Sequence, residues 1–145
     1  MDFFTSMRIS ASGMTAQQTR MNTVSSNLAN AETTETEEGG AYRRRDPIFT
    51  ATADRETFGE ILTNEMDSHA QGVLVTEIEE DKKPPRMVYN PKHPHANKEG
   101  YVAMPNVNSV EEMANMITAS RSYEANVTAL NAAKSMAIKA LEIGK

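Results

Sequence analysis

The side chains best suited to chemistry lie in a proline-rich stretch of the chain. His93 and His95 are two residues apart, and the carboxylate of Asp81 or Glu99 could join them as a metal ligand. A metal site needs a fixed geometry and supporting hydrogen bonds around its ligands. Because exposed histidine pairs on flexible loops occur often without metal, we expect a solvated loop, with no metal site and no bound cofactor.

Recognisable catalytic motifs do not occur elsewhere in the chain. The sequence has no nucleophile elbow, no phosphate-binding glycine loop and no His-Glu-x-x-His zinc motif. It also has no cysteine, which removes thiolate catalysis and cysteine-based zinc sites. We therefore predict that the protein is not an enzyme.

The charge pattern argues against nucleic acids and membranes as partners. The 145 residues include 15 basic and 20 acidic side chains, whereas nucleic-acid binding needs a basic face. The basic cluster Arg43, Arg44 and Arg45 is interpreted as a solvated or intersubunit surface, facing acidic segments such as 35–38 or 77–81 of a neighbour. The sequence has no run of about 18 apolar residues, the length needed to cross a membrane. The polar N-terminal residues do not resemble a cleaved secretory signal.

Proline and glycine divide the chain into three zones. All 6 prolines lie in residues 32–106, together with most of the glycines, so the two proline-free ends, 1–31 and 107–145, are predicted to be helices. The middle zone is predicted to be a β-rich insert. Its expected strands are 42–53, 72–79, 86–89 and 101–104, with a turn at 80–85 from which the strand at 86–89 returns and a helical spacing over 54–69.

The predicted N-terminal helix has a narrow apolar row. The row contains Met7, Met14, Met21 and Leu28, which recur every seven residues. A row one residue wide is too thin to hold a lone helix on a core, so we favour a seam between subunits over an ordinary two-helix core. Asn27 and Asn30 either end this helix through hydrogen bonds to its backbone or bridge neighbouring helices.

The predicted C-terminal helix starts at a capping box formed by Ser109 and Glu112. Its seam follows the 3-4 spacing of a coiled coil with two polar insertions. The seam positions are Met113, Met116, Ser120, Tyr123, Val127, Leu130, Lys134, Ala137 and Leu141, with Arg121 at the flank. A helix over residues 109–143 would be about 52 Å long, which exceeds the diameter of a compact domain of 16.0 kDa.

These elements predict a mainly α fold with a small β-rich insert. The long N- and C-terminal helices would pair as an antiparallel, coiled-coil-like hairpin, with the insert at its far end. Because such a pair has no broad core, the missing burial would have to come from other subunits, as in rings and helical tubes. The alternative is a helical adaptor or chaperone-like module that holds a single partner.

Several segments carry a family resemblance. They include SSNLANA at 25–31, GGAYRR at 39–44, VYNPKHPHA at 88–96, EGYV at 99–102, PNVN at 105–108, EEM at 111–113 and ASRSYEAN at 119–126. Together they resemble the flagellar basal-body rod proteins, in particular the C-type subunits of the proximal rod. Asn90 and His95 occupy positions where that family often has aspartate.

The resemblance implies a structural rod subunit that transmits torque. Its terminal helices would form an inner tube around the export channel, and the insert would face outward. The implied partners are copies of itself, other rod proteins, the flagellar type III export apparatus and the MS-ring region of the basal body. The implied location is the periplasm-spanning rod, reached without a cleaved signal peptide. The expected assembly residues are Met7, Met14, Met21, Asn27, Leu28, Asn30, Met113, Met116, Arg121, Tyr123, Asn126, Val127, Leu130 and Leu141.

Overall fold

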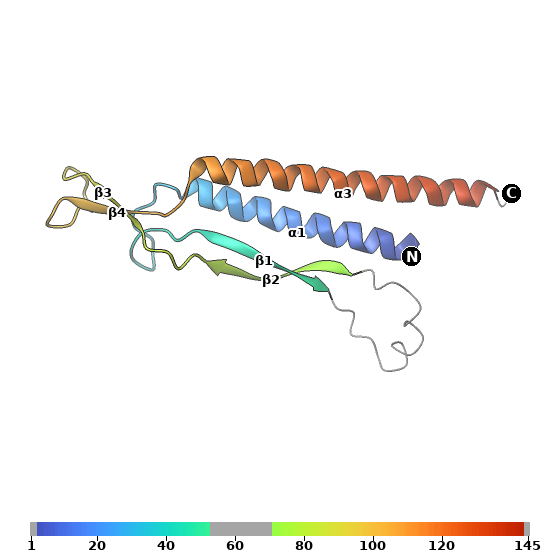
Figure 1. Cartoon of the computed structure of the whole chain (residues 1–145), viewed down its shortest axis with the longest axis horizontal. Helices are drawn as coiled ribbons and strands as arrows, with labels where there is room; N and C mark the ends of the chain where they lie inside the picture. The colour runs from blue at the N-terminus through green and yellow to red at the C-terminus, as the bar shows by residue number, and fades with distance from the viewer. Residues whose placement is uncertain (1–2, 53–70, 144–145) are drawn as a thin grey trace, which may run out of the picture.

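A computed structural model describes residues 3–52 and 71–143 of the chain (Figure 1). The elements are α1 (Phe3–Ala29), β1 (Arg45–Thr52), β2 (Gly72–Glu80), β3 (Arg86–Tyr89), β4 (Tyr101–Met104) and α3 (Ser109–Ile143). The two terminal helices and the strands between them confirm the predicted elements. The helical spacing over 54–69 lies outside the described residues.

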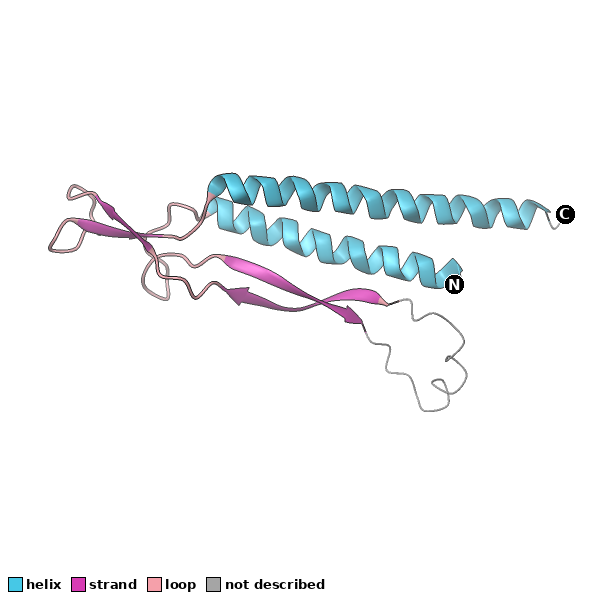
Figure 2. Cartoon of the chain, viewed as in Figure 1, coloured by secondary structure: helices cyan, strands magenta, loops and turns pink. Residues whose placement is uncertain are grey.

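The two helices form an antiparallel hairpin (Figure 2). At one point of the seam, a Cβ placed on Gly13 would lie 3.0 Å from Nδ2 of Asn126. At another, Nδ2 of Asn27 lies 2.9 Å from Oε2 of Glu112. The two contacts are separated by the same number of residues on both helices, so the pairing keeps one register along the seam.

The buried side of α3 is rotated from the predicted one. The predicted seam positions Met116, Tyr123, Leu130 and Ala137 are half-buried. Three other predicted seam positions are less buried than the residues directly before them. Glu112, Ala119 and Ala133 are buried, each one residue before the predicted Met113, Ser120 and Lys134. Small side chains allow two helix axes to approach closely, and the carboxylate of Glu112 is neutralised by partners described below. Met113 and Lys134 are therefore left exposed.

The methionine row of α1 is not its most buried line. Met7, Met14, Met21 and Leu28 are all half-buried. The buried residues of α1 are Ala16, Thr23, Val24 and Asn27. The centre of the seam is therefore built from small and polar side chains, and the larger methionines flank it.

Strands β1 and β2 pair antiparallel from Arg45↔Glu80 to Thr52↔Gly72, with a register shift between Ile48 and Phe49. This hairpin lies along α1, on the side away from α3 (Figure 1). Ser12 Oγ accepts a hydrogen bond of 3.1 Å from the backbone N–H of Val73.

The layers are therefore α3, α1 and the β1–β2 hairpin, with α1 in the middle. Besides the Ser12 bond, the guanidinium of Arg20 lies 4.3 Å from the ring centroid of Phe49, which ties the same layer to β1. The expectation that the whole insert lies at the far end is wrong for this half of it. The physical reason is that α1 has a second face, where the Ser12 hydroxyl and the Arg20 guanidinium bind the strands.

Strands β3 and β4 pair antiparallel, from Arg86↔Met104 to Tyr89↔Tyr101, and extend beyond the ends of the helices (Figure 1). The returning strand at 86–89 therefore pairs with 101–104 and not with 72–79. Pro84 and Pro85 lie in the connection, where neither can donate a ladder hydrogen bond and both favour extended backbone. The chain thus leaves β2 without turning back onto it.

Gly13 provides a test of the helix register. We expect Gly13→Leu to lower the free energy of unfolding by about 1–2 kcal/mol, because its side chain would overlap Asn126 and overpacking is destabilising. Leucine is by itself the better helix former, by roughly 0.8 kcal/mol, so a loss would have to come from the contact. Thermal unfolding followed by circular dichroism at 222 nm measures it.

The matched control for Gly13→Leu is the double variant Gly13→Leu/Asn126→Ala. Shortening residue 126 removes the atoms that the leucine would meet, so part of the lost stability should return. An unchanged melting temperature in Gly13→Leu would contradict the register.

Candidate functional site

The side-chain amide of Asn27 joins four segments of the chain. Its Nδ2 donates to the backbone oxygen of Arg45 at 2.8 Å and to Oε2 of Glu112 at 2.9 Å. Its Oδ1 accepts from the backbone N–H of Arg45 at 2.9 Å and from the hydroxyl of Tyr42 at 3.0 Å. Asn27 is 0% exposed, and these four bonds use both donors and both acceptor sites of its amide.

Glu112 is the second buried polar group of this junction and is also 0% exposed. Its Oε1 accepts a hydrogen bond of 2.8 Å from Nε of Arg44, whose Nη1 lies 3.1 Å from Oδ2 of Asp46. Burial of the Arg44 guanidinium by itself lowers its pKa, but the hydrogen bonds to Glu112 and Asp46 outweigh burial and leave the pKa raised. The buried carboxylate is thus compensated by a charged guanidinium and a neutral amide.

The start of α3 is capped by Asn108 and not by the predicted capping box. Oδ1 of Asn108 accepts from the backbone N–H of Val110 at 3.1 Å, and its backbone oxygen accepts from Glu112 N–H at 2.9 Å. Both carboxylate oxygens of Glu112 bind Asn27 and Arg44 instead. A glutamate in the first turn of a helix can either cap that helix or bind a distant part of the chain, and Glu112 does the second.

The arginine cluster has its partners within the chain. Arg44 binds Glu112 and Asp46, and Nη2 of Arg45 lies 2.9 Å from Oε1 of Glu80 on the neighbouring strand. The expectation that these arginines meet acidic residues of a neighbour is therefore wrong for Arg44 and Arg45. Arg43 is exposed.

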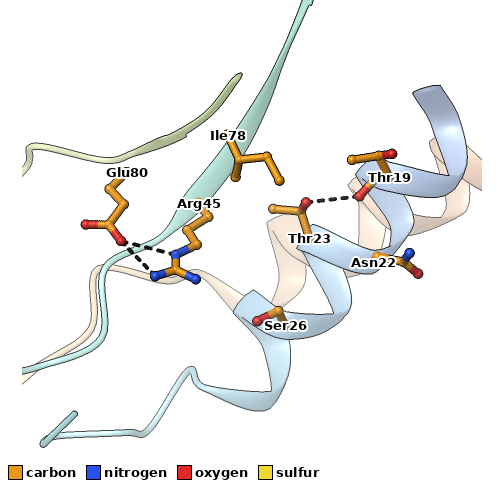
Figure 3. A pocket seen from close by; sticks show the side chains of 7 residues that line it. All are labelled: Thr19, Asn22, Thr23, Ser26, Arg45, Ile78 and Glu80. Atoms are coloured by element: carbon orange, nitrogen blue, oxygen red, sulfur yellow. Dashed lines mark hydrogen bonds and ion pairs between the residues drawn. The ribbon is translucent and has the colours of Figure 1, made fainter. Parts of the chain in front are cut away.

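A groove of about 490 Å³ separates α1 from the end of the β1–β2 hairpin. It is lined by Thr19, Asn22, Thr23, Ser26, Arg45, Ile78 and Glu80 (Figure 3). Figure 3 shows the Arg45–Glu80 ion pair on the strand side and Thr23 bonded to Thr19 along the helix. The one carboxylate in the lining is paired with the one guanidinium, so these residues form no nucleophile and base pair.

The histidine pair fastens the loop between β3 and β4. Nδ1 of His95 lies 2.9 Å from Oγ1 of Thr34, and its Nε2 lies 2.9 Å from Oε2 of Glu35. Nδ1 of His93 accepts the backbone N–H of His95 at 3.1 Å. Within residues 3–52 and 71–143, no three His, Asp or Glu side chains gather as potential metal ligands.

The predicted assembly residues fall into three classes of exposure. Asn27 is buried; Met7, Met14, Met21, Leu28, Asn30, Met116, Tyr123, Asn126, Val127 and Leu130 are half-buried; Met113, Arg121 and Leu141 are exposed. Asn30 ends α1, since its Nδ2 donates to the backbone oxygen of Ser26 at 2.9 Å. Asn27 instead links α1 to β1 and α3 of its own chain.

Sequence reasoning missed three residues of the junction: Tyr42, Arg44 and the tertiary role of Glu112. Each contacts a partner that is distant in sequence, up to 85 positions for Asn27 and Glu112. No spacing rule connects such positions, and the residue types alone suggested a surface cluster and a cap. Only the resemblance indicated that the segments around Asn27 and Glu112 matter together.

Large apolar side chains remain uncovered on several parts of the described chain, including Phe4 of α1 and Ile48, Leu74 and Ile78 of the β1–β2 hairpin. On α3 they are Val110, Met113, Ile117, Met136, Ile138 and Leu141, and on β3 and β4 they are Met87, Tyr89 and Tyr101. The buried apolar residues of the described chain are few and mostly small, namely Ala16, Val24, Val102, Ala119 and Ala133. Uncovered apolar surface of this extent marks contacts with other molecules. Neither described helix combines the length and hydropathy needed to cross a membrane.

Comparisons with known proteins agree with this geometry. A family described as "Flagella basal body rod protein" matches residues 7–35, and one described as "Flagellar basal body rod FlgEFG protein C-terminal" matches residues 98–143. The flagellar basal-body rod protein FlgC of Bacillus subtilis is 45% identical and aligns over 100% of both chains. FlgC of Borreliella burgdorferi is 44% identical over 99% of this chain and 98% of its own, and FlgC of Aquifex aeolicus is 40% identical over 100% and 99%.

The chain belongs to the FlgC family of flagellar basal-body rod proteins. It is therefore a structural rod subunit and not an enzyme. The two matched segments contain Asn27 and Glu112, so both sides of the buried junction lie in the parts that define the rod family. Nothing in these comparisons supports the single-partner adaptor.

The junction is tested by removing the charge of Glu112. We expect Glu112→Gln to lower the free energy of unfolding by about 3 kcal/mol, because it removes the buried charge that pairs with the half-buried Arg44 guanidinium, which then keeps only Asp46 as an ionic partner. An amide would also turn an N–H toward a donor, either Arg44 Nε or Asn27 Nδ2. Urea unfolding followed by circular dichroism measures the change.

The neighbouring Glu111→Gln is the matched control, since Glu111 is exposed in the same helical turn. It should change the free energy of unfolding by no more than about 0.5 kcal/mol. Equal urea midpoints for the two variants would show that the buried carboxylate does not hold the fold together.

Proposed function

We propose that the chain is a subunit of the proximal flagellar rod, where its helix pair, residues 1–31 and 107–145, builds an inner tube around the export channel. In this arrangement α3 faces inward and the middle zone, residues 32–106, faces outward. The layer order supports the proposal: α1 separates α3 from the β1–β2 hairpin, so a tube walled by α3 carries the hairpin on its outside. Such a tube transmits torque through its packed helices.

The observation that carries the proposal is the exposed apolar row at the start of α3. Val110, Met113 and Ile117 follow helical spacing, and all three are exposed in the single chain, with Ile117 56% exposed. Burying a side chain of this size is worth about 1.5–3 kcal/mol. Neighbouring subunits that cover this row would supply the burial that the single chain lacks.

We also propose that α1 and α3 pack as a coiled-coil-like pair within each subunit. The buried and half-buried positions of α3 along its seam with α1 alternate in steps of four and three residues, which is the spacing of a coiled-coil seam. They are 112, 116, 119, 123, 126, 130, 133 and 137. The predicted assembly residues outside this seam, such as Met113, Arg121 and Leu141, are then free to contact copies of the chain and other rod proteins. The half-buried methionines of α1 are available at the edge of the same seam.

The proposed location is the periplasmic rod near the MS ring, reached through the flagellar type III export apparatus. A chain that passes through a narrow channel must unfold readily and carry no cross-links. Both conditions are supported here, since the buried apolar residues of the described chain are few and the sequence has 0 cysteines. The family membership supports the rod itself.

The assembly surface is tested with Ile117→Asp. The side chain is exposed in the single chain, so the purified variant should keep its helical circular dichroism and melting temperature. In cells that depend on the variant, we expect loss of swimming and loss of the chain from isolated basal bodies, because a carboxylate cannot be buried unpaired between subunits.

Ile117→Leu is the control, since it keeps the apolar area at the same position. It should restore swimming and incorporation to near the parental level. Normal basal bodies and normal swimming with Ile117→Asp would count decisively against the proposed surface.

A further inference from the structure

The strand pair β3–β4 has apolar side chains on both faces. Side chains alternate along a strand, so in the observed register Met87, Tyr89 and Tyr101 share one face, while Val88 and Val102 share the other. Val102 is buried and Val88 half-buried, whereas the first face is open to solvent and Tyr89 is 65% exposed. The two tyrosine rings contact each other edge to face, with centroids 5.3 Å apart.

This exposed face, formed by Met87, Tyr89 and Tyr101, is here called the aromatic tip. A two-stranded sheet is only marginally stable alone, and its outer face is built from the residue types that are enriched in protein interfaces. It extends beyond the ends of the helices, where no other described element of the chain covers it (Figure 1). The aromatic tip therefore suits a surface that another molecule completes.

The opposite end of the molecule has a second uncovered apolar surface. Because Gly13 lies opposite Asn126, the same register places Phe3 opposite residue 136. The helix α3 continues from there to residue 143, which adds about 10 Å at 1.5 Å per residue. Figure 1 shows α3 reaching past the N-terminal end of α1. Met136, Ile138 and Leu141 are exposed on this segment, here called the α3 end, and Leu141 is 76% exposed.

The α3 end continues an interface that already exists. The seam between α1 and α3 runs from Glu112 past Ala133 to Ala137, and the turns that follow lie beyond Phe3. An apolar element placed in line with α1 would extend this seam without rearranging the helix pair. Within the described residues, α1 is the only element that packs on α3, so the last turns of α3 are left for a neighbouring subunit along the long axis.

We propose that the aromatic tip of one rod-family subunit packs on the α3 end of the next subunit in line. This contact rests on the proposed rod function and names one of its subunit interfaces. The two surfaces lie at opposite ends of the molecule, so a head-to-tail contact between them repeats without closing on itself, as a rod requires. The segment 98–143 that matches the rod-family model contains the α3 end and β4 with Tyr101, whereas Met87 and Tyr89 on β3 lie outside it.

The test is site-specific photo-cross-linking in isolated basal bodies. The photoreactive residue p-benzoylphenylalanine replaces Leu141 in one strain and Tyr89 in another, and the latter exchange keeps an aromatic ring at the exposed position. We expect the probe at 141 to join the β3–β4 segment of a second rod-family subunit, identified by mass spectrometry of the cross-linked peptides. The probe at 89 should join the last turns of the C-terminal helix of such a subunit.

A probe at Glu124 is the control, since it is exposed on α3 but distant from the α3 end; it should give no product with a β3–β4 segment. Products of both test probes with any other segment or protein, or no product from either in basal bodies that contain the chain, would overturn this contact and leave the rod function intact. If immunoblots find the unmodified chain absent from basal bodies, the proposed rod function fails, and this contact fails with it.

Discussion

A buried carboxylate is the constraint on which the rest of this structure depends. Glu112 has no access to water, so its charge must be met by groups of the chain. Arg44 and Asn27 meet it, and Asn27 is in turn bonded to the backbone of Arg45. The end of α1, the start of β1 and the start of α3 are thereby brought to one point. In a chain with so little apolar core, directional bonds define the arrangement that burial alone would leave open.

Two further sets of contacts complete the fold: those between α1 and α3, and those between α1 and the β1–β2 hairpin. Along the seam, Gly13, Ala16, Ala119 and Ala133 are small enough for the two helices to lie close over many turns. Across α1, the Ser12 hydroxyl and the Arg20 guanidinium hold the β1–β2 hairpin on the other side. The helix α1 thus packs against other elements on two faces, whereas α3 packs against α1 on one face. The unequal coverage leaves the exposed apolar row on α3 and not on α1.

The sequence predicted the elements well because their signals are local. The clustering of proline and glycine located both helices and the β-rich middle zone, and the family resemblance indicated the segments expected to take part in assembly. The choice of Met113 over Glu112 for the seam was wrong because apolar size favoured methionine, while burial of glutamate depends on Arg44, which is distant in sequence. The pairing of β3 with β4 was missed for a different reason, since a turn signal does not determine which strand the chain pairs with after the turn.

The division between polar and apolar groups explains why such a subunit can be both ordered and incomplete. At the junction every hydrogen-bonding site of Asn27 is used within the chain, so the relative position of helices and hairpin does not require a neighbour. The exposed apolar side chains of α3 and of the β3–β4 pair are the opposite case, because nothing in the described chain covers them. Hydrogen bonds demand fixed geometry, and apolar contacts tolerate adjustment. A subunit that fixes its own shape with hydrogen bonds and leaves apolar contacts to its neighbours can join several related partners without refolding.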